Sequence, residues 1–506
     1  MSEVSSPIAR LVAGRDNAPA ILAPDRPALT HGELRSLIGR TGERLGALGL
    51  GRGSRVAIVL PNGPEMASAF VALASTVATA PLNPAYKEDE FDFYLGDLRA
   101  DAILVGERED GPALAAARRL GIGVLRLIAS DGKASGAFDI DGSPTGPPRP
   151  VVPPAAGDTA LLLHTSGTTS RPKLVPLSHG NLAASAAHIG QTLTLTPGDR
   201  CLNIMPLFHI HGLVAAVLSS LAAGGSVFCT PGFNALRFFA WLGEAEPTWY
   251  TAVPTMHQAI LSRADRNRDA TGRTRLRFIR SSSASLPPQV MAELESAFGC
   301  PVIESYGMTE AAHQMTSNPL PPRPRKPGSV GPAAGPEVAI MADDGTMQPA
   351  GATGEIVIRG PNVTAGYESN AEANRTAFAH GWFHTGDQGT MDAEGYIRVT
   401  GRLKEIINRG GEKISPLEVD EVLMDHPAIA QVVTFAMPHE KLGEEVAAAV
   451  VLREGAGASE QDIRAFAAAR LADFKVPRRV VLLDEIPKGA TGKLQRIGLA
   501  AKLGLA

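Results

Sequence analysis

Cysteine is scarce in this sequence. Its 506 residues include only three cysteines, Cys201, Cys229 and Cys300, and no two of them form a Cys-x-x-Cys pair. Zinc sites and disulfide frameworks need clustered cysteines, so neither is expected to organise this protein. We expect the three cysteines to be small residues of the hydrophobic core.

Long apolar runs and an excess of one charge are also missing. The most apolar stretch, residues 213–229, is interrupted by serines and glycines, and it falls short of the ~20 residues of a membrane span. A net charge of -4 favours neither nucleic acid nor an anionic membrane as the main partner. Residues 1–15 lack the apolar core of a signal peptide, and residues 504–506 are not a Ser-Lys-Leu signal. We therefore expect a bacterial-type cytoplasmic protein without a membrane span, of undetermined oligomeric state.

Strand and helix signals alternate in the first part of the chain. Thr30 and Glu33 have the spacing of a capping box, which predicts a helix that ends before Gly49 and Gly51. Further helices are predicted over 65–78 and 113–120, and strands over 55–60, 101–105 and 124–128. Repeated strand–helix–strand units predict an α/β fold with parallel sheets and helices on both faces.

The pattern changes at two loops and near residue 401. Residues 129–157 and 318–327 are rich in Gly and Pro and predict surface loops. Short strands over 337–341 and 355–359 predict a β-rich subdomain. Beyond Gly401, helices near 416–424 and 460–471 predict a small α+β unit. We place an N-terminal domain at 1–401 and a C-terminal domain at 402–506.

The clearest local motif is rich in hydroxyl groups. An apolar run, 161–163, precedes Thr165-Ser166-Gly167-Thr168-Thr169-Ser170-Arg171-Pro172-Lys173. Hydroxyls, free backbone N–H groups and two cations can bind polyphosphate oxygens. The motif is not a Walker A loop, because no glycine precedes Lys173. Taken alone, it is equally explained as a polar turn between a strand and a helix.

Four more motifs follow in order: 305–310 (Ser-Tyr-Gly-Met-Thr-Glu), 384–387 (His-Thr-Gly-Asp), 401–405 (Gly-Arg-Leu-Lys-Glu) and 487–493 (Pro-Lys-Gly-Ala-Thr-Gly-Lys). In this order the five motifs resemble those of the adenylate-forming superfamily. The resemblance implies a large N-terminal α/β domain with a β-rich subdomain, and a small mobile C-terminal domain with its hinge at Lys404. It also implies an ATP- and Mg²⁺-dependent ligase that converts a small carboxylic acid to its adenylate and transfers the acyl group to coenzyme A.

The same resemblance assigns a nucleotide site. Glu310 is the implied magnesium ligand, and a carboxylate suits that hard cation. Thr309 would contact the α-phosphate, Tyr306 would stack on adenine, and Asp387 with Arg402 would bind the ribose. The remaining implied ATP contacts are Thr165, Ser166, Gly167, Thr168, Thr169, Lys173, Ser283, Ala284, Ser285, Glu304, Ser305, Gly307 and Met308.

Three further assignments come from the resemblance, each with a simpler alternative. Lys493 would reach the α-phosphate and the acid during adenylation; the alternative is an ordinary lysine in a solvated loop. His209 would lie near the reacting carboxylate; the alternative is a core histidine. After rotation of the C-terminal domain, Arg409, Gly410 and Gly411 would line a pantetheine tunnel; paired glycines also suit a tight turn.

The acid pocket is predicted to be polar. Residues 280–286 read Arg-Ser-Ser-Ser-Ala-Ser-Leu, where aryl- and fatty-acid ligases often have small apolar residues. Buried hydroxyls against an alkyl tail would lose hydrogen bonds at about 1–3 kcal/mol each, so a second carboxylate suits this pocket better. This segment, with 248–258, 308–319 and 402–416, resembles the oxalate–CoA ligase branch.

We therefore predict oxalate as the substrate, with Ser283 and His313 on its distal carboxylate, His211 on the pocket side and Arg280 as a further contact. Serines that cap strand ends, with His313 behind the pocket, are the alternative. Other candidate functions are a CoA ligase for another small, medium-chain or aryl acid, adenylation followed by transfer to a carrier or by oxidation, and a non-catalytic nucleotide-binding protein. A Rossmann oxidoreductase is excluded, because no Gly-x-Gly-x-x-Gly follows a strand.

Overall fold

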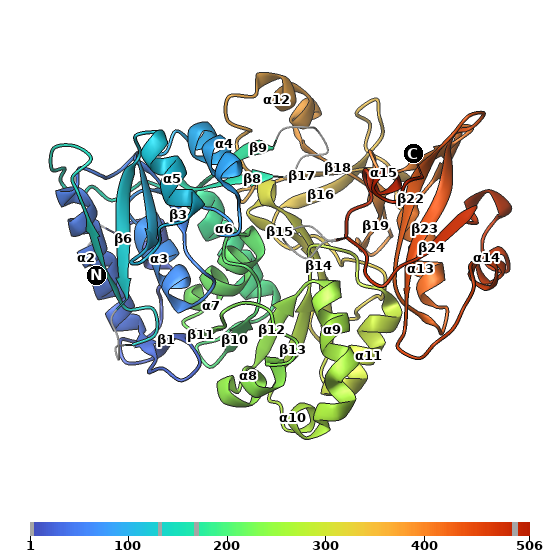
Figure 1. The fold of residues 1–506 in the computed structure, drawn as a ribbon, viewed down its shortest axis with the longest axis horizontal. Coiled ribbons are helices and arrows are strands. Elements are labelled where there is room, and N and C mark those ends of the chain that lie inside the picture. The colour runs from blue at the N-terminus through green and yellow to red at the C-terminus, as the bar shows by residue number, and fades with distance from the viewer. Residues whose placement is uncertain (1–4, 130–133, 166–171, 488–493, 506) are drawn as a thin grey trace.

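The computed structural model describes residues 5–129, 134–165, 172–487 and 494–505. Two large sheets occupy the N-terminal part of the chain, and two smaller sheets follow toward the C-terminus (Figure 1). No helix in these ranges is long and apolar enough to cross a membrane. The three cysteines are buried and unpaired, as predicted.

The first large sheet has seven strands and is mainly parallel. Its strands, in spatial order, are β7 (Phe138–Gly142), β6 (Gly123–Ala129), β5 (Ala102–Gly106), β3 (Arg55–Val59), β4 (Ala78–Pro81), β8 (Thr159–Thr165) and β9 (Lys173–Ser178). The helices of this region are α2 (His31–Ala47), α3 (Pro64–Ala74), α4 (Glu88–Leu98), α5 (Pro112–Arg119) and α6 (His179–Thr192). The Thr30–Glu33 capping box is formed and begins α2 as predicted.

The second large sheet has eight strands. Its strands, in spatial order, are β15 (His313–Ser317), β14 (Val302–Met308), β13 (Phe278–Ser281), β12 (Trp249–Ala252), β10 (Arg200–Asn203), β11 (Ser226–Cys229), β1 (Pro19–Leu22) and β2 (Leu29–Thr30). The strands from β14 to β1 are parallel, and the two edge strands are antiparallel. Its helices are α1 (Pro7–Arg10), the π-helix η1 (His211–Leu218), α7 (Ser219–Ala222), α8 (Phe238–Ala245), α9 (Pro254–Ala264), η2 (Asp265–Asn267), α10 (Arg268–Gly272), α11 (Pro288–Phe298) and η3 (Thr309–Ala311).

The two large sheets share one hydrophobic core. Helices α3 and α6 contact strands of both sheets, and both also pack against η1. All eight residues of η1 are buried, so the apolar stretch that begins at residue 213 is core, as predicted. This core fixes the second sheet in place, and its strands carry the candidate site.

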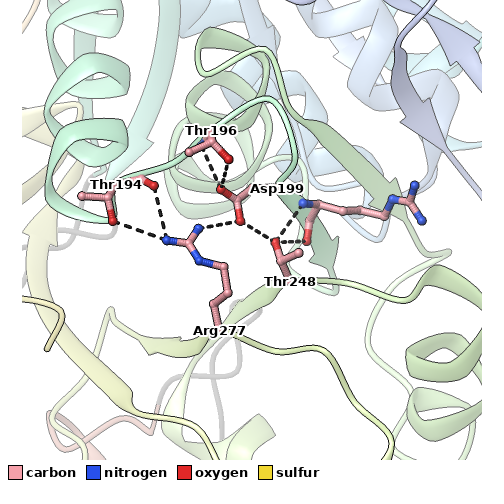
Figure 2. A network of polar contacts seen from close by, with 6 residues as sticks. Thr194, Thr196, Asp199, Thr248 and Arg277 are labelled. Carbon is pink, nitrogen blue, oxygen red and sulfur yellow. Dashed lines mark hydrogen bonds and ion pairs between the residues drawn. The ribbon is translucent and has the colours of Figure 1, made fainter.

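A polar network ties together the amino ends of three strands of that sheet (Figure 2). Asp199, Thr248 and Arg277 each come directly before a strand, β10, β12 and β13 respectively. Arg277 Nη1 donates to Asp199 Oδ1 at 2.6 Å, and the Thr248 hydroxyl donates to the same oxygen at 2.7 Å. The other oxygen of Asp199 accepts from the backbone and the hydroxyl of Thr196. Asp199 is 4% exposed, and both of its oxygens have partners.

The β-rich subdomain is a four-stranded antiparallel sheet, as predicted. It consists of β16 (Glu337–Met341), β17 (Thr353–Arg359), β18 (Phe383–Met391) and β19 (Ile397–Arg402), with α12 (Ala371–Ala377) and η4 (Ala379–Gly381) in the connection. The fold is therefore the predicted α/β fold with a β-rich subdomain and an α+β C-terminal part.

The C-terminal part begins after β19 and has its own sheet. The strands are β20 (Ile407–Arg409), β21 (Glu412–Ile414), β22 (Ile429–His439), β23 (Gly443–Leu452) and β24 (Arg479–Leu482), and the helices are α13 (Pro416–Met424), α14 (Glu460–Ala468), η5 (Asp473–Lys475) and α15 (Leu499–Lys502). Gln258 of α9 donates to the Ala430 carbonyl, and Glu293 of α11 pairs with Arg453, so this part rests against α9 and α11. The domain boundary at 401–404 stays a prediction.

Two details of the predicted fold were wrong. The helix predicted over 65–78 ends at Ala74, and Ala78 begins β4, which pairs with β3 in parallel register. The predicted loop 129–157 contains β7, which pairs with β6 in antiparallel register. In β7 the side chains of Phe138 and Ile140 are buried and the two aspartates between and after them are exposed. The Gly- and Pro-rich flanks concealed this short alternation.

Candidate active site

The predicted site residues gather at the carboxyl ends of parallel strands in the eight-stranded sheet. Ala252, Ser281 and Glu304 are neighbours across β12, β13 and β14. Beyond this row, residues 282–285 leave β13, while β14 continues through Tyr306, turns at η3 and returns as β15. Ligands of open α/β sheets bind at this edge, because the polar loops after each strand converge there.

One part of the site is a chain of three polar side chains. The Tyr306 hydroxyl donates to Asp387 Oδ2 at 2.5 Å, and Arg402 Nε donates to Asp387 Oδ1 at 3.0 Å. Asp387 is 5% exposed, whereas 44% of the Arg402 side chain is exposed. The Asp387 carboxylate raises the pKa of Arg402, so this cation stays charged beside its acid. The three residues predicted for adenine and ribose are thus in direct contact.

A second group surrounds Glu310, the predicted magnesium ligand. Glu310 is 6% exposed, and its Oε1 accepts from the Tyr367 hydroxyl at 2.9 Å. Lys173 Nζ lies 4.4 Å from the centre of the Tyr367 ring. Burial raises the pKa of Glu310. Burial lowers the pKa of Lys173, and repulsion from the Lys404 ammonium lowers it further. Each shift favours the neutral form of the side chain. A bound phosphate would favour the charged form of Lys173, and a bound metal cation would favour the charged form of Glu310.

In this group, the described residues offer Mg²⁺ one buried carboxylate, that of Glu310. Among the described residues, no cluster of three or more His, Cys, Asp or Glu side chains could enclose a metal ion. Mg²⁺ takes most of its ligands from phosphates and water and needs only one or two carboxylates. Glu310, a buried carboxylate beside Lys173, suits that role, and an all-protein metal cage is excluded for the described residues.

A third group is a cluster of polar side chains, mostly buried, from four segments. His211 in η1 is fully buried, with its Nε2 2.6 Å from Thr251 Oγ1 and its Nδ1 3.0 Å from Ser283 Oγ. The rings of His211 and His313 meet edge to face, with centroids 4.8 Å apart. The structure therefore brings together three of the four side chains that the sequence predicted for the acid, and adds Thr251.

Arg280 lies behind this cluster, next to His313, and has no acidic partner among the described residues. It is fully buried, and its Nη2 lies 3.3 Å from Gln314 Oε1 and 3.5 Å from His313 Nδ1. Its Nε and Nη1 have no hydrogen-bond partner in the described ranges, where no carboxylate pairs with it. Burial lowers the pKa of Arg280 to about 9, which leaves the guanidinium charged at neutral pH. An unpaired buried cation is costly, and an anionic ligand would offset that cost.

The backbone around this cluster adopts conformations that are rare for residues other than glycine. Ser283, Ala312 and His313 all have positive φ, at 74°, 47° and 98°. A Cβ on Gly307 would lie 1.6 Å from the His313 carbonyl oxygen, so only glycine fits at this step of the 305–310 motif. Strained backbone of this kind clusters at functional sites, because the surrounding structure must be built to hold it.

The remaining predicted ATP contacts fall into two sets. Thr165 and Lys173 face each other at the ends of β8 and β9. Glu304, Ser305, Met308 and Thr309 lie on or just after β14, and Ala284 and Ser285 are exposed beside Ser283. Predicted contacts that lie outside the described residues are Ser166, Gly167, Thr168, Thr169 and the catalytic candidate Lys493.

The other candidate residues have clear local positions. His209 precedes η1, and its Nδ1 accepts from the His211 backbone N–H at 3.4 Å. Gly410 and Gly411, with φ of 59° and 102°, form the two-residue turn between β20 and β21. Arg409 Nε donates to Glu445 at 2.6 Å. Lys404 is exposed and near enough to Lys173 to affect its pKa. The tunnel and hinge roles stay predictions.

Three residues of the site were missed from sequence: Thr251, Gln314 and Tyr367. Thr251 is a polar residue within a fully buried strand, which is a usable signal. Gln314 and Tyr367 are placed by pairing between distant segments, and no local pattern marks them.

Comparison with known families agrees with this geometry. The model of the "AMP-binding enzyme" family matches residues 8–368, and that of the "AMP-binding enzyme C-terminal domain" matches residues 418–493. The chain belongs to the AMP-binding enzyme family. The predicted boundary at 401–404 lies between the two matched ranges.

Relatives of this AMP-binding enzyme match along almost its whole length. It is 47% identical over 499 residues to an oxalate–CoA ligase of Arabidopsis thaliana, covering 94% of this chain and 95% of the relative. It is 42% identical over 470 residues to an oxalate–CoA ligase of Saccharomyces cerevisiae, covering 88% and 86%. The crystal structure of ATP-bound MatB from Rhodopseudomonas palustris superimposes with a TM-score of 0.88 at 30% identity, covering 98% of each chain. This AMP-binding enzyme is an AMP-forming acyl-CoA synthetase.

Proposed function

We propose that this enzyme is an oxalate–CoA ligase. One carboxylate oxygen of oxalate attacks the α-phosphorus of ATP, and the bond to the leaving pyrophosphate breaks. The thiol of coenzyme A then attacks the carbonyl carbon of oxalyl adenylate, loses its proton, and releases AMP. The products are oxalyl-CoA, AMP and pyrophosphate.

The observation that carries the choice of oxalate is Arg280. An alkyl or aryl tail would need apolar surroundings, yet a fully buried guanidinium that no described carboxylate neutralises lies behind His313. Ser283 and His313 both contact His211 in front of this guanidinium. The second carboxylate of oxalate, distal to the reacting one, would accept hydrogen bonds from these groups and offset the buried charge of Arg280. The two oxalate–CoA ligase relatives support the same choice.

The first step brings two anions together, so the protein must neutralise charge while pyrophosphate leaves. Lys173 and the hydroxyl-rich loop would bind the β- and γ-phosphates, and Thr309 and Lys493 the α-phosphate. Glu310 would hold Mg²⁺, which lowers the repulsion between the phosphates when bound. The Tyr306–Asp387–Arg402 chain would orient the nucleoside, and His209 would stand beside the reacting carboxylate.

A panel of acids tests this proposal. Oxalate, malonate, acetate, hexanoate and benzoate are assayed with ATP, Mg²⁺ and coenzyme A, and the thioester is measured directly. We expect oxalate to have the highest kcat/KM. Oxalate-dependent exchange of pyrophosphate into ATP reports the first step alone. A Ser283→Ala, His313→Ala double variant should raise the KM for oxalate strongly. Ser283 is expected to contact adenine only through its backbone, which alanine keeps, so the KM for ATP should stay near wild type. If wild type ignores oxalate and uses hexanoate or benzoate, the substrate assignment is wrong.

A further inference from the structure

Gln314 is the nearest polar neighbour of Arg280, and its amide is held from three sides. The residue is fully buried in β15. Its Nε2 donates to Thr192 Oγ1 at 3.1 Å and to the Ala334 carbonyl at 3.0 Å. Because both acceptors lie on the nitrogen side, the amide oxygen must face the guanidinium, at 3.3 Å from Arg280 Nη2. Thr192 ends α6, so this helix takes part in orienting the amide.

The partner of Arg280 is a neutral amide, whereas two less buried arginines, Arg277 and Arg496, have acids. Arg277 pairs with Asp199 and Arg496 pairs with Asp420, each at 2.6 Å. A glutamate differs from Gln314 by one terminal atom and would bind a guanidinium more strongly. The amide therefore fixes the position of Arg280 but leaves its charge uncancelled. Such an arrangement costs stability unless the missing anion comes from the ligand.

We propose that Gln314 determines the specificity of the acid pocket: it positions Arg280 with a neutral acceptor and so reserves the guanidinium charge for an anionic distal group on the substrate. This inference rests on the proposed function. Gln314 is a positioning residue and acts through Arg280. Replacing its amide by a carboxylate supplies an internal anion, which competes with the second carboxylate of oxalate.

The test compares Gln314→Glu with Gln314→Met on two acids of the same shape. Oxamate has an amide where oxalate has its second carboxylate, so it lacks only the distal charge. For Gln314→Glu we expect the ratio of kcat/KM for oxalate to that for oxamate to fall about 30-fold or more, since a close charge pair is replaced. For Gln314→Met, which leaves Arg280 charged but less well placed, we expect a smaller fall. The KM for ATP should stay near wild type in both.

The order of the two variants separates charge from packing. A purely structural role predicts equal losses on both acids, with a raised KM for ATP or a lower kcat throughout. That result overturns the inference, as does an unchanged oxalate-to-oxamate ratio in Gln314→Glu. If Gln314→Glu fails to fold, Thr192→Val removes only one tether of the amide. It should raise the KM for oxalate several-fold, and an unchanged KM contradicts the inference. If wild type does not use oxalate at all, the proposed function fails instead.

Discussion

Two arginines three residues apart show how differently the two ends of one sheet are built. At the amino end, Arg277 is paired with Asp199, and the hydroxyls of Thr248 and Thr196 donate hydrogen bonds to the two oxygens of the same carboxylate (Figure 2). At the carboxyl end, Arg280 is buried beside a neutral amide, and the acid of that region, Glu304, has its Oε2 unpartnered among the described residues. At the first end, the charge and the hydrogen-bonding groups of Asp199 are satisfied without a ligand. The second end keeps cation and acid apart, at a cost in stability that a bound substrate would reduce.

Removing Arg280 should show the largest effect. Arg280→Met takes away the buried cation together with its hydrogen bonds to an anionic substrate, so kcat/KM for oxalate should fall about 100-fold or more. The melting temperature should stay the same or rise, because a buried charge without an acid is replaced by an apolar group. Steady-state kinetics with thermal unfolding measures both quantities. Arg280→Lys is the matched control and should recover part of the activity, since lysine keeps a charge but not the planar fork.

The corresponding change at the other end should have the opposite profile. Arg277→Met leaves Asp199 buried without its cation, and should lower the free energy of unfolding by about 2–3 kcal/mol; this allows for the 38% exposure of the Arg277 side chain. Urea unfolding measures the loss, and kcat/KM per folded molecule should match wild type. Arg277→Lys should restore much of the stability. A loss of activity without a loss of stability would contradict the division between the two ends.

A smaller effect is expected from the pH dependence of the two acids. Burial raises the pKa of Glu304 to about 8, whereas its ordinary value is 4.5. The folded state therefore keeps a proton that the unfolded state has lost, and stability falls as the pH rises from 4.5 through 8. Between pH 7 and 8 this amounts to about 1 kcal/mol. In Glu304→Gln, whose amide oxygen can still accept from the Leu286 N–H, melting temperatures between pH 6 and 9 should show this slope removed.

Asp199 supplies the contrast for that measurement. Burial alone would raise its pKa, but hydrogen bonds from Arg277 and Thr248 outweigh burial and leave the pKa below its ordinary value. Its contribution to stability is therefore present above the unfolded pKa and is lost only in acid, as the pH falls through the folded value. A pH 7–8 slope that persists in Glu304→Gln would show that the extra proton is held elsewhere.

The sequence predicted those features whose signals are local. The capping box at Thr30 set the start of α2, because its two hydrogen bonds join residues three positions apart. The strand β4 was missed, because alanines carry no strand signal and its pairing with β3 depends on contacts across the sheet. The same division applies to the site. Ser283, His211 and His313 were predicted through motifs, whereas Gln314 was not.

From the sequence, Arg280 was predicted only as a further contact, because the residues next to it in the chain do not reveal its three-dimensional environment. Its isolation from acids follows from the pairing of β13 with β14, the turn after Met308 and the return of β15. The approach of Gln314 also needs the irregular register near Gly307. These features depend on contacts between segments that are distant in the sequence, so no short stretch of sequence predicts them.

The reversal of β15 has a practical consequence. From β10 to β14 the chain passes through at least one helix between successive parallel strands, but after β14 it turns back through the short η3 and pairs with the strand just completed. Glu304, Tyr306, Glu310, His313 and Gln314 therefore sit within one short contiguous cassette. Exchanging residues 304–317 between ligases would transfer the predicted adenine, magnesium and acid contacts of this segment in one step, which offers protein engineers a compact module for redirecting acid choice.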